Sequence, residues 1–125
     1  MYEEEQNIKI NVKEVDESNY KKEIIKLLLV MKLIRLSRRN IYKINIYTNL
    51  QIDEDFTCDI YFEDIKRKEV RIFNIVSKKI DKKKEDFYNQ LKIYGMNETI
   101  YNKIYVDSIS DDINEMDKQL EEYLW

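Results

Sequence analysis

The sequence has no histidine, no proline, one glycine and one cysteine among its 125 residues. Without histidine, Ser-His-Asp and Cys-His catalysis and nearly every catalytic zinc site are excluded. The lone Cys58 excludes an intramolecular disulfide and a structural zinc or iron–sulfur site. The lone Gly95 excludes glycine-rich nucleotide-binding loops, so we expect no nucleotide cofactor. Any catalysis must therefore use carboxylates, Lys, Tyr or a hard cation such as Mg²⁺.

Long apolar runs are also missing. The longest run, Leu27–Met31, lies between Lys26 and Lys32 and is far shorter than the ~20 residues that cross a bilayer. Residues 1–6 are acidic and lack the apolar centre of a signal peptide. The sequence therefore predicts a cytoplasmic protein that does not associate with a membrane.

The residues that are present suit one folded domain. Hydrophobic residues make up 43% and charged residues 38% of the chain, as in a domain with a densely charged surface. The length allows one core and is short for two. We expect a single domain over residues 1–125, with an acidic arm and edge strand over 1–17, a basic core over 18–106 and an acidic helix over 107–125.

The net charge of −3 is unevenly distributed. Residues 1–17 carry six acidic and two basic side chains, and residues 107–125 carry seven acidic and one basic, which leaves +7 on residues 18–106. A basic centre with acidic ends indicates either a nucleic-acid-binding surface or a centre that its own acidic ends cover. The sequence leaves both interpretations open.

Hydrophobic periodicity predicts an α/β (α+β) fold with a central mixed sheet and the order β-α-β-β-β-α-β-α. The expected elements are an edge strand with Ile8, Ile10 and Val12, a helix from a Ser18 or Asn19 cap to Arg39, strands Ile41–Tyr47, Phe56–Phe62 and Val70–Val76, a helix from an Asp81 cap to Tyr94 with Gly95 as its C-cap, a strand Ile100–Val106, and a helix from Ser110 to Leu124. A polar link, Asn49–Asp55, should join the first two of the three central strands.

The second and third central strands should form an antiparallel hairpin that turns near Lys66. In that register residue 59 faces roughly residue 73. Asp59 should therefore lie beside Asn74, with Val76 and Lys78 farther along the same face.

This order, with Cys58-Asp59, Asn74–Lys78 and Gln90–Tyr94, resembles the restriction-endonuclease-like or PD-(D/E)xK nuclease superfamily, which includes archaeal Holliday-junction resolvases. The resemblance covers residues 19–124 and implies a restriction-endonuclease-like core. In that superfamily an Asp opens the second strand, an acid-x-Lys follows on the third, and the next helix often carries Gln and Tyr near its end. The two carboxylates hold Mg²⁺, and the Lys orients or deprotonates the attacking water.

The resemblance assigns Asp59 as the metal ligand and catalytic acid, but the rest of the motif is degenerate. If Asn74 replaces the second acid, Val76 replaces the Lys; if Val76 replaces the acid, Lys78 is the retained Lys. Glu23 matches the position of a helical Glu that some resolvases add. Mg²⁺-dependent phosphodiester cleavage is therefore expected to be lost or weak, and whether the chain is an enzyme stays open.

The candidate nucleic-acid-binding residues are basic side chains near the ends of two helices, together with a Gln and a Tyr. The Gln and the Tyr are expected to share one face of their helix. They are Lys79, Lys82, Lys83, Lys84, Arg38, Arg39, Gln90 and Tyr94. The first hypothesis is thus a nuclease relative that binds DNA or RNA. The alternative is a non-catalytic interaction or assembly module, such as a homodimer, that uses its acidic ends and the apolar tip Tyr123–Trp125.

Overall fold

The computed structural model describes residues 8–11, 20–38, 43–77 and 81–124. It confirms the expected mixed α+β architecture. Its elements are β1 (Ile8–Asn11), α2 (Tyr20–Arg38), β2 (Ile44–Asp53), β3 (Phe56–Asp64), β4 (Glu69–Val76), α3 (Lys82–Gln90), β5 (Glu98–Tyr105), the 3-10 turn η2 (Val106–Ser108), α4 (Ile113–Leu120) and the 3-10 turn η3 (Glu121–Tyr123).

The strands form one five-stranded sheet in the order β1-β2-β3-β4-β5. The three central strands are antiparallel, whereas β1 is parallel to β2 and β5 is parallel to β4. Tight turns can join only antiparallel neighbours, so α2 and α3 serve as the crossovers for the two parallel pairs. The first strand lies at an edge of the sheet, as its pattern predicted.

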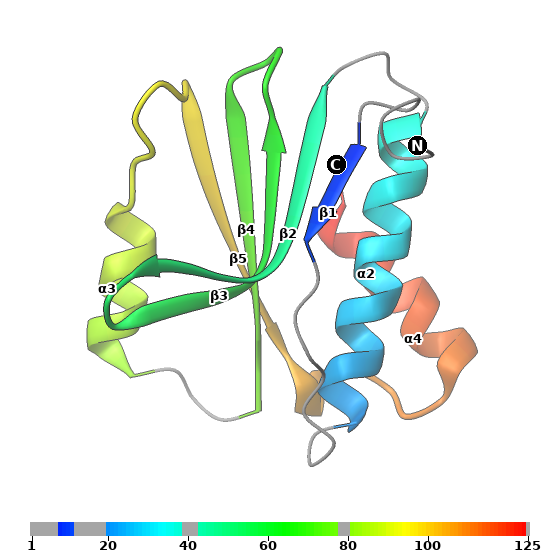
Figure 1. Cartoon of the computed structure of the whole chain (residues 1–125). Coiled ribbons are helices and arrows are strands. Elements are labelled where there is room, and N and C mark those ends of the chain that lie inside the picture. Colours follow the sequence, from blue (N-terminus) through cyan, green and yellow to red (C-terminus); the bar gives the residue numbers. More distant parts are fainter. Residues whose placement is uncertain (1–7, 12–19, 39–42, 78–80, 125) are drawn as a thin grey trace.

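Helices cover both faces of the sheet, with α2 and α4 on one side and α3 on the other (Figure 1). The larger core lies under α2 and α4 and includes Leu29, Ile60 and Met116. The smaller core lies under α3 and includes Ile72 and Tyr88. Alternating strand residues supply the two cores, because successive side chains of a strand point to opposite faces.

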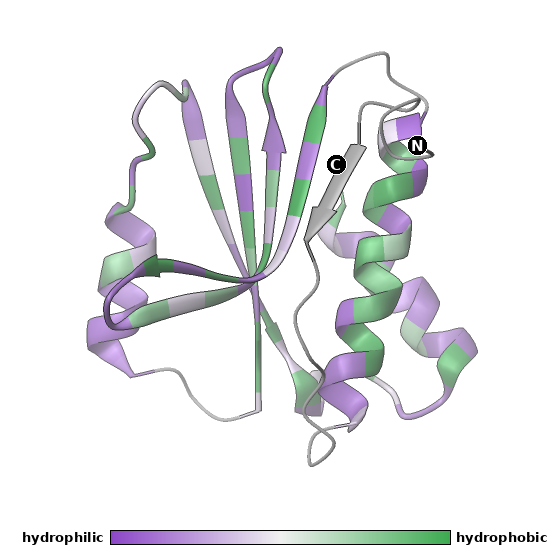
Figure 2. Cartoon of the chain, viewed as in Figure 1, coloured by the Kyte–Doolittle hydropathy of each residue, from purple (hydrophilic) through white to green (hydrophobic). Residues whose placement is uncertain are grey.

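Helix α2 is apolar around most of its circumference, which Figure 2 shows as hydrophobic bands along its length. Ile25, Leu29 and Leu33 recur every four residues and are fully buried against the sheet. Two other side chains, Leu27 and Met31, are about half exposed, at 60% and 49%. Among the described residues, no helix combines the length and the apolar character needed to cross a membrane.

The hairpin β2–β3 is longer than its sequence pattern predicted. The expected polar link Asn49–Asp55 is wrong for most of its length, because β2 continues to Asp53 and only Glu54 and Asp55 form the turn. The long hairpin curves away from the rest of the sheet toward α3 (Figure 1). There the ring of Phe56 stacks on Phe87 at 4.2 Å.

Helix α3 ends earlier than expected, at Gln90, and Leu91 is already extended. Leu91 packs against the smaller core, which competes with continuing the helix. The predicted face shared by Gln90 and Tyr94 is therefore wrong, and Tyr94 is fully exposed. Gly95 does take a left-handed conformation, with φ 83°, but in a separate turn and not as the helix C-cap.

The C-terminal helix is also shorter than predicted. Asp112, and not Ser110, is its N-cap, and its carboxylate accepts hydrogen bonds from two backbone N–H groups of the first turn. The helix ends at Leu120. Tyr123 and Leu124 pack against the larger core. The apolar tip, as far as Leu124, therefore docks on the domain itself.

Candidate functional site

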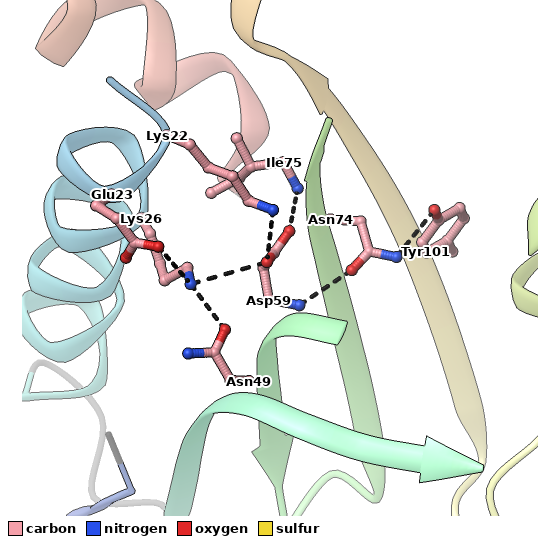
Figure 3. A network of polar contacts seen from close by, with 8 residues as sticks. All are labelled: Lys22, Glu23, Lys26, Asn49, Asp59, Asn74, Ile75 and Tyr101. Carbon is pink, nitrogen blue, oxygen red and sulfur yellow. Dashed lines mark hydrogen bonds and ion pairs between the residues drawn. The ribbon is translucent and has the colours of Figure 1, made fainter. Parts of the chain in front are cut away.

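The candidate site lies at the fork where β3 and β4 separate. The last paired residues before the fork are Ile60 and Phe73, so Asp59 lies opposite Asn74, one residue from the predicted register. Beyond this pair, hydrogen bonds from side chains replace the backbone hydrogen bonds between β3 and β4 (Figure 3). The Asp59 N–H donates to Asn74 Oδ1 at 3.0 Å, and the Ile75 N–H donates to Asp59 Oδ2 at 2.7 Å.

A local change of strand phase turns Asp59 toward α2. Asn49, opposite Asp59 on β2, has φ 52°, a left-handed conformation that Asn tolerates better than most residues. On β3, Ile60 belongs to the core beneath α2, whereas Cys58 belongs to the core beneath α3. Two residues that a regular strand would place on one face thus lie on opposite faces.

The sequence predicted that Asn74 shares a face with the Asp59 carboxylate, and this prediction is wrong. It is buried, and its Nδ2 donates to Tyr101 Oη at 3.2 Å, on the side covered by α3. Figure 3 shows Asn74 and Tyr101 on one side of Asp59 and the lysines of α2 on the other. The residue of β4 that shares the α2 face with Asp59 is Ile75, which belongs to the larger core.

Two lysines of α2 are the nearest charges to Asp59. Its Oδ1 lies 3.3 Å from Lys22 Nζ and 3.8 Å from Lys26 Nζ. Lys26 also lies 3.4 Å from Glu23 Oε1 and donates to Asn49 Oδ1 at 2.7 Å. Our sequence reasoning missed both lysines. The available signal was Lys26 itself, a charge within the apolar part of a deeply packed helix.

The resemblance implied Mg²⁺, and the donors at the fork do not fit it. The Asn74 amide faces Tyr101, and the Lys26 ammonium lies between the carboxylates of Asp59 and Glu23. Within the described ranges, no group of three or more His, Cys, Asp or Glu side chains could hold a metal ion.

An open pocket of about 430 Å³ lies against the fork. Lys22 from α2 and Lys84 from α3 bring two positive charges to its wall, and Asp59 brings one negative charge. The remaining lining residues are Thr57, Ile75, Val76 and Ser77. Lys84 forms no ion pair with the rest of the described chain. The pocket therefore carries a net positive charge and side-chain hydroxyls, the chemistry that binds phosphate.

The other predicted binding residues are only partly brought together. Lys82 and Lys83 lie exposed on the first turn of α3, next to Lys84. Arg38 lies sixteen residues after Lys22 on α2, a rise of about 24 Å, so it is remote from the pocket. Gln90 is exposed at the far end of α3. Lys78, Lys79 and Arg39 lie outside the described residues.

The acidic C-terminal segment covers part of the basic centre. Lys32 Nζ lies 2.9 Å from Asp117 and 2.5 Å from Glu121, and Lys21 lies 2.8 Å from Asp111. Burial by itself would lower the pKa of Lys32, but the hydrogen bonds to Glu121 and Asp117 outweigh it and raise the pKa. The covered-centre interpretation is thus confirmed for these lysines of α2.

The aromatic residues and the cysteine near the fork are packing residues. Tyr88 stacks on Tyr101 with the ring centroids 4.7 Å apart. Burial raises the pKa of Tyr61 and of Tyr88 to about 12. Burial likewise raises the pKa of the Cys58 thiol to about 12, so the thiol is protonated and unreactive at neutral pH.

Comparison with protein-family models, curated proteins and solved structures finds no match to this chain. The likeness to the PD-(D/E)xK superfamily therefore depends on the order of the elements and on the residues of the fork.

Proposed function

We propose that this chain is a nuclease-like domain that binds nucleic acid at the fork pocket and has lost Mg²⁺-dependent cleavage. The element order supports the resemblance: a helix, three antiparallel strands, a crossover helix and a strand parallel to the third. Asp59 lies at the fork of the hairpin, where the motif of that superfamily has its first acid.

The observation that carries the binding proposal is the convergence of Lys22 and Lys84 on one pocket from helices on opposite faces of the sheet. Lys84 has no carboxylate partner in the described part of the chain, so it can pair with a phosphate without breaking an ion pair. Exposed hydroxyl residues, Thr57 and Ser77, line the same pocket. A backbone phosphate is the ligand class that this set recognises.

The loss of cleavage follows from the residues around Asp59. Metal-dependent cleavage needs at least one further carboxylate on the same face and a lysine near the attacked phosphate. Ile75 takes the β4 position on that face, the ammonium of Lys26 lies between Asp59 and the nearby carboxylate of Glu23, and Lys22 also pairs with Asp59. The proposed domain therefore binds and does not cut.

The test is fluorescence anisotropy with single-stranded and duplex DNA and RNA oligonucleotides across a salt series. Wild-type protein should bind at low salt and weaken as salt rises. The double variant Lys22→Gln/Lys84→Gln should bind about tenfold more weakly at low salt and show a salt slope lower by about 1 to 2.

The matched control is Lys118→Gln, which removes an exposed charge on α4. It should change affinity less than about twofold. No binding of any oligonucleotide by wild-type protein at low salt would refute the proposal. Equal losses in the double variant and the control would refute the fork pocket as the binding site.

A second candidate function, a homodimeric assembly module, is favoured by the outer face of α2. Tyr20, Ile24, Leu27 and Met31 follow one another at helical spacing and are 67%, 37%, 60% and 49% exposed. Such a stripe on a helix is typical of a protein interface. Sedimentation of wild-type protein and Leu27→Glu tests it: a dimer that the variant abolishes supports assembly, and a wild-type monomer at high concentration refutes it.

A further inference from the structure

We propose that the ammonium of Lys26 is a built-in cation that occupies the place where the resemblance would put a divalent metal. The proposal does not depend on nucleic-acid binding. It starts from the disagreement between the donors at the fork and a Mg²⁺ site. What the donors do fit is an ammonium group held by oxygen atoms from three elements.

The geometry places three oxygen atoms around Lys26 Nζ (Figure 3). Asn49 Oδ1 lies at 2.7 Å, Glu23 Oε1 at 3.4 Å and Asp59 Oδ1 at 3.8 Å. They come from β2, α2 and β3. We call these three residues and Lys26 the Lys26 cage. Carboxylate and amide oxygens are also the ligands of hard divalent cations, so the cage has the donors of a metal site around a lysine.

Burial makes the ammonium necessary at this place. The side chains of Lys26, Asp59 and Glu23 are only 7%, 14% and 17% exposed. Two carboxylates held near each other with little water around them need a cation between them. Lys22 reaches Asp59 from the pocket side, but no ion pair joins it to Glu23 in the described structure.

The backbone of Asn49 provides an independent observation. It is the residue of β2 in a left-handed conformation, and the same phase change turns Asp59 toward α2. Backbone strain of this kind persists where surrounding contacts determine it. The contact made here is the hydrogen bond from Lys26 Nζ to Asn49 Oδ1. The hairpin is thus shaped around the ammonium.

The proposal predicts that a divalent cation can replace the ammonium once it is removed. We would titrate MnCl₂ into wild-type protein, Lys26→Met and Lys32→Met, with electron paramagnetic resonance for free Mn²⁺ and thermal unfolding for stability. Lys32→Met is the matched control, because Lys32 is also a buried lysine of α2 with two acidic partners. Those partners are about half exposed and lie on the C-terminal segment.

Wild-type protein and Lys32→Met should not bind stoichiometric Mn²⁺, and Mn²⁺ should not measurably raise their Tm. Lys26→Met should bind about one Mn²⁺ per chain and gain at least about 5 °C in Tm at saturating metal. The double variant Lys26→Met/Asp59→Asn, which keeps Asn49 and Glu23 but lacks the Asp59 carboxylate, should lose that gain.

Three results would overturn the proposal: stoichiometric Mn²⁺ uptake by wild-type protein, a gain in Lys26→Met no larger than in Lys32→Met, or a gain that survives Asp59→Asn. If Lys26→Met does not fold without metal, circular dichroism replaces thermal unfolding. Mn²⁺ must then restore the helical signal, and its failure to do so would also overturn the proposal.

Discussion

Lys26 and Lys32 lie six residues apart on α2 and are equally buried, at 6% and 3% exposure, but their surroundings differ. Lys26 contacts oxygen atoms from its own helix and from both strands of the curved hairpin, and its carboxylate partners are largely buried. Lys32 contacts Asp117 and Glu121, whose side chains are 53% and 57% exposed.

The difference shows that the burial of a lysine does not by itself measure its importance. When a buried cation is removed, the cost depends on whether its partners are left buried and unpaired or can be hydrated. Without Lys26, Glu23 would have no ion-pair partner in the described structure, and Asp59 would keep only Lys22. The partners of Lys32 would remain in water on the C-terminal segment. One lysine thus organises the candidate site, and the other attaches a surface helix.

The largest expected difference is between Lys26→Met and Lys32→Met in metal-free buffer. Lys26→Met should lower the free energy of unfolding by about 3 kcal/mol, since it leaves the poorly hydrated carboxylate of Glu23 unpaired and leaves Asp59 with Lys22 alone. Lys32→Met should lower it by about 1 kcal/mol or less, because its partners are exposed. Urea unfolding of both variants measures this, and equal losses would remove the distinction between the two sites.

A smaller difference is expected between the acidic partners, Asp59 and Asp117. Asp59→Ala removes a partner of two lysines and the acceptor of the Ile75 N–H, so we expect a loss of about 2 kcal/mol. Asp117→Ala should cost about 0.5 kcal/mol, because Glu121 still pairs with Lys32. The same urea experiment compares them, and a larger loss in Asp117→Ala would contradict the account.

The smallest expected effect is the pH dependence of the Lys32 pairs. The pKa of Lys32 is raised from its ordinary value of 10.5, so its contribution to stability is fully present below pH 10.5 and is lost as the pH rises through the folded-state pKa. The difference in stability between wild-type protein and Lys32→Met should therefore be constant from pH 7 to about 10 and shrink above that. A difference that grows above pH 10.5 would show that the pairs do not hold Lys32 charged.

Much of the fold could be predicted because its signals are local. Alternating apolar residues identified the hairpin, and the observed pairing of Ile60 with Phe73 lies within one residue of the rough register that was predicted. The end of α3 was misplaced because Leu91 fits a helical pattern, whereas packing against the smaller core draws it into an extended conformation. Tertiary packing overrides propensity at such boundaries.

The candidate site was harder to predict because long-range contacts form it. The predicted hairpin correctly placed Asp59 beside Asn74. No local sequence pattern signals the left-handed conformation of Asn49 or the change of strand phase. The side chain that contacts both Asn49 and Asp59 is Lys26, which is 33 residues before Asp59 in the sequence. The motif expected from the resemblance directed attention to β4, and the charges that neutralise Asp59 come from α2.

The proposed function is binding of nucleic acid at the fork without a divalent metal and without cleavage. The most direct test measures how tightly wild-type protein binds a labelled oligonucleotide at low salt, and whether it cleaves it. The measurement is made once in EDTA and once in millimolar Mg²⁺ or Mn²⁺. We expect the affinity in EDTA and in metal to agree within about twofold at matched ionic strength. We also expect the oligonucleotide to stay intact after prolonged incubation. Binding that requires the metal, or cleavage that the Asp59→Ala variant abolishes, would contradict the proposed function.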